Sequence, residues 1–151
     1  MTTDAFRWTC KQFNDLAPTE LYGILRLRSE VFVVEQNCVF LDADNNDHAA
    51  WHVMSWRDRE LVASSRILPP AVTFREASIG RVVTAQSVRR LGVGKELMRY
   101  SLDRLYELLG KVPVRIGAQL YLKKFYESFG FKQSGDAYLE DGIEHIEMVK
   151  D

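Results

Sequence analysis

Hydrophobic and polar positions alternate along several short stretches of the chain, while other stretches repeat their apolar residues every three or four positions. Alternation, or a short run that is apolar throughout, predicts a β-strand, whereas a period near 3.6 predicts an amphipathic helix. The stretches that predict strands are Ala5–Phe13, Trp51–Trp56, Leu61–Leu68, Ala77–Thr84, Val112–Gln119 and two more at the C-terminal end. Trp51–Trp56 and Leu61–Leu68 are separated only by the polar RDRE segment, which predicts a hairpin.

Three stretches have helical spacing. The first begins at Pro18, since proline suits the first turn of a helix, and its stripe comprises Leu21, Ile24, Leu25, Arg28, Val31 and Phe32. Whether VFVVEQ continues this helix or bends away from it is left open by the periodicity. The second helix ends at Gly110, and its apolar face comprises Leu97, Met98, Ser101, Leu102, Leu105, Leu108 and Leu109. The third covers Tyr121–Phe129 and is closed by Gly130.

The order of these elements is strand, helix, three strands, helix, strand, helix, strands. It predicts an α/β fold built on a mixed sheet, with residues 1–151 forming a single domain.

An apolar content of 46% and a charged content of 27% are those of an ordinary globular protein. The net charge of −1 offers no basic field for nucleic acid. Neither a signal peptide nor an apolar run of about 20 residues is recognisable, so we expect no membrane contact and a cytoplasmic location.

No metal site is expected from the cysteines, histidines or acidic residues. Cys10 and Cys38 lack a metal-binding spacing, and we interpret them as free thiols, with one disulfide as the alternative. The stretch LDADNNDHA could suggest a calcium loop through its three aspartates, but the glycine and the terminal glutamate of that motif are missing. We therefore predict a solvated loop with Asx turns over Leu41–Ala49.

The stretch VRRLGVGKELMRYSLDRL places Gly92 and Gly94 directly before the second helix. The first N–H groups of a helix are unpaired and lie at the positive end of its dipole, so they bind anions. Glycines let a ligand approach the backbone, and three cations add charge at the rim, namely Arg89, Arg90 and Lys95. A phosphate site and a plain tight turn both fit this pattern.

Two familiar phosphate loops do not fit this stretch. A Walker loop requires Ser or Thr after Gly94-Lys95, where the chain has Glu96. A dinucleotide-binding loop requires a third glycine where the chain has Leu97.

The segment from Arg89 to Gly94 resembles the Arg/Gln-x-x-Gly-x-Gly/Ala loop of the GNAT family of N-acetyltransferases. The strand IGRVV before the loop, the strand VRIGAQ after its helix and the segment KKFYESFGF follow in the order that this family has. More narrowly, the chain resembles the ElaA-like branch over nearly its whole length. That likeness is carried by LRSEVFVVEQ, GAQLYLKKFYESFGF and EDGIEHIEM.

The resemblance implies a GNAT fold in which two parallel central strands splay apart and hold acetyl-CoA as co-substrate. The pantetheine arm would pair with the backbone of Val82, Val83 and Thr84. The pyrophosphate would bind the loop that comprises Arg89, Arg90, Leu91, Gly92, Val93, Gly94 and Lys95. The acceptor would be a primary amine of a small molecule or peptide, attacking the thioester directly. A homodimer is common in the family.

Tyr126 occupies the position of the family's proton donor, where its phenol would protonate the leaving thiolate; a core aromatic is the alternative interpretation. For the general base, Glu35 and His52 are candidates, and each could instead be structural. His145 and His48 rank below them. The three aspartates of the acidic loop hint at a cationic acceptor, although surface loops are often acidic for other reasons.

Two further functions remain open at this point. LRSEVFVVEQ also resembles a segment of the acyl-homoserine-lactone synthases, which share a related fold and use acyl carriers. A non-catalytic domain that binds acyl-CoA as a sensor or interaction module is the second alternative. The turnover of acetyl-CoA with a panel of amines would separate these from an N-acetyltransferase.

Overall fold

The computed structural model describes residues 6–151, so Ala5, the predicted start of the first strand, lies outside the described residues. The strands are β1 (Arg7–Gln12), β2 (Trp51–Arg57), β3 (Glu60–Leu68), β4 (Ser78–Thr84), β5 (Val114–Gln119), β6 (Lys132–Glu140) and β7 (Ile143–Lys150). The helices are α1 (Pro18–Arg28), α2 (Val93–Leu109) and α3 (Lys123–Glu127). The predicted element order and the mixed α/β fold class are confirmed.

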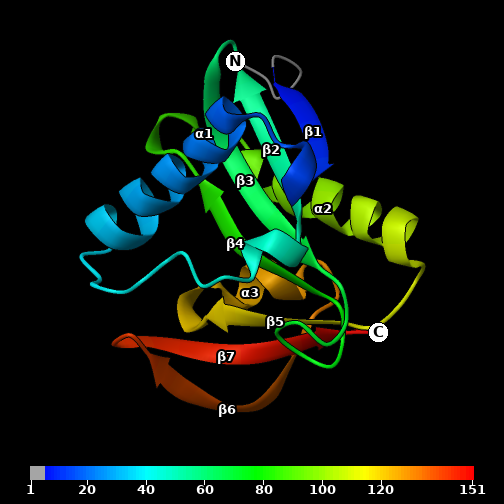
Figure 1. Cartoon of the computed structure of the whole chain (residues 1–151). Helices are drawn as coiled ribbons and strands as arrows, with labels where there is room; N and C mark the ends of the chain where they lie inside the picture. The colour runs from blue at the N-terminus through cyan, green and yellow to red at the C-terminus, as the bar shows by residue number, and fades with distance from the viewer. Residues whose placement is uncertain (1–5) are drawn as a thin grey trace.

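The strands form two sheets that meet at one point (Figure 1). The first has the order β1-β2-β3-β4 and the second the order β5-β7-β6, each with antiparallel neighbours. A parallel bridge between Ala77 and Val114 joins them, and the Arg115 N–H donates to the Ala77 carbonyl at 2.9 Å. β4 and β5 therefore start side by side and then diverge into separate sheets.

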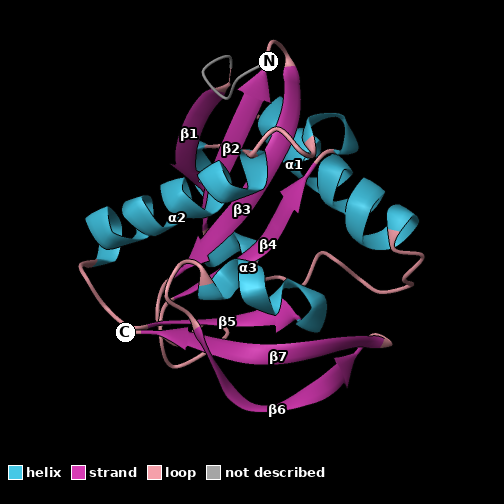
Figure 2. Ribbon diagram, turned by 180° about the vertical axis from the view of Figure 1, so that it is seen from behind, coloured by secondary structure: helices cyan, strands magenta, loops and turns pink. Residues whose placement is uncertain are grey.

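The four-stranded sheet is covered on both faces by helices. α1 and α2 cross it on opposite sides, as comparison of Figures 1 and 2 shows. Every residue of β3 from Leu61 to Leu68 is consequently buried. This explains why that strand, apart from Arg66, is continuously apolar or small rather than alternating.

The helix boundaries follow from local chemistry. Pro18 is the first residue of α1, and the Ala17 N–H donates to the Glu20 carboxylate at 2.8 Å, which satisfies one unpaired donor of the first turn. Gly110 ends α2 with a φ of 85°, as predicted. The segment after α1 continues as a π-helix over Ser29–Glu35, whose wider turn explains why periodicity could not assign it.

The acidic loop differs from its prediction. We expected solvated carboxylates over Leu41–Ala49, but Asp42 and Asp47 are buried and Asp44 is half-buried. These aspartates face three arginines from α1, β3 and β4, namely Arg28, Arg66 and Arg81. The loop is thus docked onto the body of the protein through buried ion pairs.

Arg28 lies at the centre of this arginine–aspartate cluster, with 1% of its surface exposed. Its Nε donates to Asp42 Oδ2 at 2.7 Å, and Nη1 and Nη2 donate to the two oxygens of Asp47 at 2.8 and 3.2 Å. Arg66 bridges Asp44 and Asp47 through Nη1, at 2.8 and 2.9 Å. Burial alone would raise the pKa of Asp47, but the hydrogen bonds and charges of Arg28 and Arg66 outweigh it and lower that pKa.

The cluster also removes one hint about the acceptor. Three carboxylates and three guanidinium groups balance within the protein, so this loop presents no excess negative charge to a cationic amine.

Among residues 6–151, no helix is both long and apolar enough to cross a membrane. Cys10 and Cys38 are free thiols, as predicted. The buried Cys38 thiol donates to the Asp141 carbonyl at 3.3 Å, which joins the segment just before the acidic loop to the turn between β6 and β7.

Candidate active site

The divergence of β4 and β5 opens one edge of β4. Within the described residues, β4 pairs with β3 along its other edge, while its bridge to β5 is confined to Ala77 and Val114. A β-bulge interrupts the pairing with β3 at Arg81, whose φ is 47°. After the bulge, Val82 and Thr84 line the cavity between β4 and β5. A ligand amide could pair with the backbone along this open edge of β4.

The N-terminus of α2 lies directly after β4. Gly92 has a φ of 80° and caps the helix without any side-chain hydrogen bond, so the first N–H groups of α2 lack an acceptor from a capping side chain. Gly94 lines the same cavity as β4. Arg90 and Lys95 are exposed beside it, and neither forms an ion pair with the rest of residues 6–151. The turn therefore has the chemistry of an anion site.

The other residues of the predicted loop have different surroundings. Val93 is buried in the core, and Leu91 is half-buried against it. Arg89 does not point to solvent: its Nη2 donates to the Thr84 carbonyl at 3.1 Å and to Glu35 Oε1 at 2.8 Å. Arg89 thus ties the loop to β4 and to the π-helix.

Glu35 is placed in the cavity wall, with both carboxylate oxygens engaged by Arg89. The hydrogen bond from Arg89 lowers the pKa of Glu35 despite some opposing effect of burial. A carboxylate held in this way is a weaker base than a free one.

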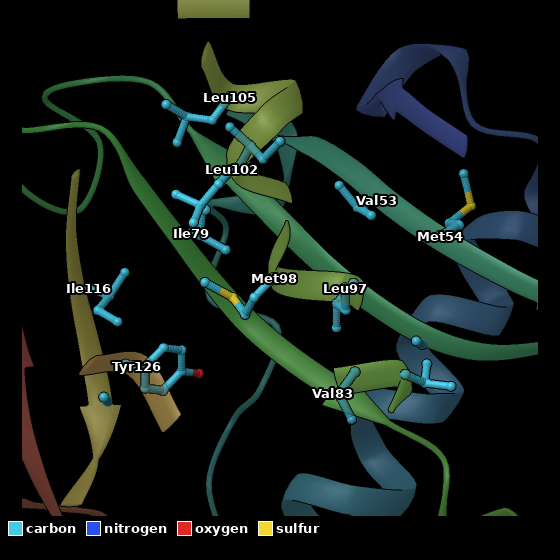
Figure 3. Close-up of a cluster of buried hydrophobic side chains, with 14 of the residues drawn as sticks. Val53, Met54, Ile79, Val83, Leu97, Met98, Leu102, Leu105, Ile116 and Tyr126 are labelled. Carbon is cyan, nitrogen blue, oxygen red and sulfur yellow. The ribbon is translucent and has the colours of Figure 1, made fainter. Parts of the chain in front are cut away.

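Tyr126 is 6% exposed and lies between the two sheets. In Figure 3 its hydroxyl points away from the β5 strand that carries Ile116. The residue lines the cavity, and no hydrogen bond within residues 6–151 involves its hydroxyl. Burial, with a smaller effect of Tyr121, raises the pKa of Tyr126 well above its ordinary value. The phenol is therefore kept protonated, as a proton donor must be.

The three histidines have different access to this site. His52 is 1% exposed, its Nε2 is 2.9 Å from the Asp47 carbonyl, and it is not part of the cavity wall. His48 is exposed and lies outside the wall too. His145 lies in the wall, with Nδ1 2.7 Å from the Ile143 carbonyl. That contact makes Nδ1 the donor and leaves Nε2 as the acceptor of the neutral ring.

The cavity measures about 990 Å³ and is lined by the end of β4, Gly94 of α2, Glu35, Tyr126 and His145. Its far wall is formed by residues that the sequence did not single out: Phe40 directly before the acidic loop, Phe74, and Tyr138 of β6. Gln36 and Gln119 exchange two amide hydrogen bonds of 3.3 and 3.2 Å, which link the end of the π-helix to the end of β5. These residues converge from distant parts of the chain, and no spacing in the sequence relates them. No cluster of histidine, cysteine and acidic side chains suited to a metal ion occurs in the described part of the chain.

Splayed strands, a helix N-terminus without a capping side chain and a buried tyrosine lie around one cavity, and this arrangement fits the class of acyl-CoA-dependent acyltransferases. Residues 30–151 match the acetyltransferase (GNAT) domain family, so the chain belongs to that family.

Within the family the chain is similar to ElaA of Escherichia coli K12, with 39% identity over 146 residues and 95% of each chain covered. The crystal structure of E. coli ElaA matches with a TM-score of 0.91 at 38% identity, covering 97% of this chain and 99% of that one. An acyl-CoA N-acyltransferase from Pseudomonas aeruginosa matches with a TM-score of 0.93 at 40% identity, again over 97% and 99% of the two chains. The predicted likeness to the ElaA-like branch is confirmed.

Proposed function

We propose that this protein transfers the acetyl group of acetyl-CoA to a primary amine by direct attack. The observation that carries the proposal is the buried Tyr126, whose hydroxyl has no hydrogen-bond partner within residues 6–151, in a cavity between the open edge of β4 and the start of α2. Two proteins with this fold support the choice of cofactor: a GNAT acetyltransferase from Elizabethkingia anophelis has acetyl-CoA bound, and an aminoglycoside 6′-N-acetyltransferase is complexed with coenzyme A.

The residues present fit acetyl-CoA. The first N–H groups of α2 would bind the pyrophosphate, with Arg90 and Lys95 adding charge. The backbone of Val82, Val83 and Thr84 would pair with the amides of the pantetheine arm, because that edge of β4 has no strand beside it. Acetyl-CoA supplies the thioester carbonyl that the amine attacks.

The chain's own groups then move the protons. A bound ammonium first loses one proton to solvent to become the nucleophilic amine, and the amine loses a second proton after its attack to end as a neutral amide. As the carbon–sulfur bond breaks, Tyr126 donates its phenolic proton to the leaving thiolate, and the phenolate is reprotonated from solvent. One carbon–nitrogen bond forms, one carbon–sulfur bond breaks, and the proton released by the amine balances the one gained by sulfur.

For the base, the contacts favour His145 over the two residues that we ranked above it. Glu35 is engaged by Arg89, and His52 is buried outside the cavity. The free Nε2 of His145 lies 3.6 Å from Glu140 Oε2, so this carboxylate would stabilise the imidazolium after it takes the proton.

Replacing His145 with glutamine tests this role. We expect turnover at neutral pH to fall by about 10²-fold, the lower end of the usual range for a positioned base, and to recover partly at high pH, where the amine is already neutral. The matched control is His48→Gln, since His48 is exposed outside the cavity. Steady-state rates between pH 6 and 10 measure both. A His145→Gln profile that overlays the parent's would remove His145 from the mechanism.

Replacing Arg90 with alanine tests the pyrophosphate site. A hydrogen bond to a charged group is worth about 1.5–3 kcal/mol, so the Kd for coenzyme A should rise by about 10- to 150-fold, as measured by calorimetric titration. Arg99→Ala is the matched control, because Arg99 is exposed on α2 and pairs with Glu96. We prefer Arg90 to Gly92 because a side chain at a φ of 80° would also strain the backbone. Unchanged affinity in the Arg90 variant would overturn this assignment.

A further inference from the structure

We infer that the acceptor is a primary amine with an apolar, preferably aromatic, body and without an anionic group. The inference rests on the proposed function, and it concerns the far wall of the same cavity. That wall combines aromatic rings with carboxylates that have no arginine partner.

Three aromatic rings form an aromatic wall, defined here as Phe40, Phe74 and Tyr138. They come from the position directly before the acidic loop, from the segment before β4 and from β6, and all three line the cavity. The Arg81 guanidinium lies 5.8 Å from the centre of the Phe40 ring. Because Arg81 is itself paired with Asp42 at 2.9 Å, the cluster that docks the loop also orients this ring.

The other two rings lie over β5 at Gly117. A Cβ atom at this glycine would lie 3.4 Å from the Tyr138 hydroxyl and 3.9 Å from the tip of the Phe74 ring. The Tyr138 ring also stacks on His145, with centroids 5.9 Å apart and an interplanar angle of 25°. The aromatic wall therefore adjoins the imidazole that we propose as the base, and an apolar body bound there would place its amine near that group.

The charges of the cavity exclude an anionic acceptor. Its three arginines are already paired: Arg66 with Asp44 and Asp47, Arg81 with Asp42, and Arg89 with Glu35. Each of them therefore already has a carboxylate counterion within the protein.

The remaining charged groups at the far wall are acidic. Glu147 is paired with Arg115 at 2.9 Å. Glu140 lies 3.6 Å from Nε2 of His145, which carries charge only when protonated, and neither Glu140 nor Asp141 pairs with an arginine or lysine within residues 6–151. Both carboxylates are exposed, and they line the same cavity as Tyr126, whose hydroxyl has no hydrogen-bond partner within residues 6–151.

The aromatic wall and the carboxylates without an arginine partner both favour a bound amine. Its ammonium form is attracted to Glu140 and Asp141 and to the faces of the aromatic rings before the proton is lost. A carboxylate beside the amine would face like charges without a counterion, and like-charge contacts across an interface are strongly unfavourable.

A matched set of acceptors tests this inference. 2-Phenylethylamine and phenylalanine share an aromatic body and differ by one carboxylate, while phenylalaninamide carries a neutral group at the same position. With acetyl-CoA as donor, we expect kcat/KM to be at least about tenfold higher for 2-phenylethylamine and phenylalaninamide than for phenylalanine. Hexylamine, which lacks the ring, should fall between 2-phenylethylamine and phenylalanine. Equal or faster turnover of phenylalanine would overturn the inference.

Two variants assign the preference to the named groups. The double variant Glu140→Gln with Asp141→Asn should reduce the discrimination against phenylalanine severalfold, and asparagine suits the φ of 51° at position 141. Tyr138→Leu should reduce the advantage of 2-phenylethylamine over hexylamine. Glu144→Gln is the control, since Glu144 is an exposed carboxylate of the same hairpin outside the cavity wall. Discrimination that is unchanged in both test variants would contradict the inference.

The result also separates this inference from the proposed function. If no amine of any kind is acetylated and coenzyme A does not bind, the proposed function fails. If amines are acetylated and the carboxylate-bearing ones are turned over as fast as the others, only the inference about the acceptor fails.

Discussion

Replacing Arg28 with methionine is expected to lower the free energy of unfolding by about 3–5 kcal/mol, the usual cost of removing one partner from a buried ion pair. Methionine fills similar space, so the loss comes from charge rather than from a cavity. Asp42 and Asp47 would stay buried after losing the hydrogen bonds of 2.7 and 2.8 Å that Arg28 donates to them. Urea denaturation followed by circular dichroism measures the change.

Arg26→Met is the matched control for this variant. Arg26 lies on the same helix and pairs with Glu30 at 2.8 Å, but both side chains are exposed. An exposed pair of this kind contributes little, so we expect no large change. Equal effects of the two substitutions would show that the buried cluster does not stabilise the fold. Should Arg28→Met fail to fold, Arg28→Lys keeps the charge, loses the paired hydrogen bonds and serves as the milder test.

The cluster also predicts how stability depends on pH. The pKa values of Asp44 and Asp47 are lowered in the folded state because hydrogen bonds and charges of arginines outweigh the effect of burial. A lowered folded-state pKa contributes stability above the unfolded-state value of about 3.9, and that contribution is lost as the pH falls through the folded-state pKa. The stability difference between the parent and Asp47→Asn should therefore be constant near neutral pH and shrink below about pH 4.

Replacing Tyr126 with phenylalanine is expected to lower turnover by about 10²- to 10⁴-fold, the range for a positioned proton donor. The hydroxyl makes no hydrogen bond within residues 6–151 that the substitution would break, so the melting temperature and the affinity for coenzyme A should change little. The loss should be largest for thioesters whose leaving thiols are most basic. Because burial raises the pKa of Tyr126, the parent's rate should not fall through phenol ionisation up to about pH 10.

Tyr106→Phe provides the control for this change. Tyr106 is a half-buried residue of α2 whose hydroxyl also lacks a partner, and it lies outside the cavity wall. Its loss should leave turnover unaffected. A Tyr126→Phe enzyme that retains more than half of the parental rate would mean that Tyr126 is a core aromatic.

The fold was predictable because its signals are local. Three such signals each specify an element within a few residues: the apolar stripe of α2 between two glycines, the RDRE turn of the hairpin, and Pro18 at the start of α1. The loop before α2 was recognisable for the same reason, since glycine at a φ of 80° next to a helix start is a short contiguous pattern.

The acidic loop was misinterpreted because its partners are remote in sequence. The hydrogen bonds of Arg28 to the loop span 14 and 19 residues, and that of Arg81 spans 39. A signal was present: Arg28 falls on the apolar stripe of α1. A charged residue at such a position needs buried partners, and the only concentration of carboxylates that follows it closely is this loop.

The candidate site was predictable only in part. The cofactor side is formed by contiguous segments, whereas Phe40, Phe74, Tyr138 and His145 meet through the docking of a loop and a hairpin onto β5. Ranking His145 below His52 reflects this, because a sequence does not reveal which strand histidine faces the cavity.

Product analysis tests the central claim most directly. The protein is incubated with acetyl-CoA and 2-phenylethylamine, coenzyme A release is followed by a thiol reagent, and the amine is analysed by mass spectrometry. Our account predicts one N-acetylated amine for each coenzyme A released, and loss of both products in Tyr126→Phe. Coenzyme A release without any acetylated amine, across primary amines with neutral, cationic and anionic bodies, would contradict it.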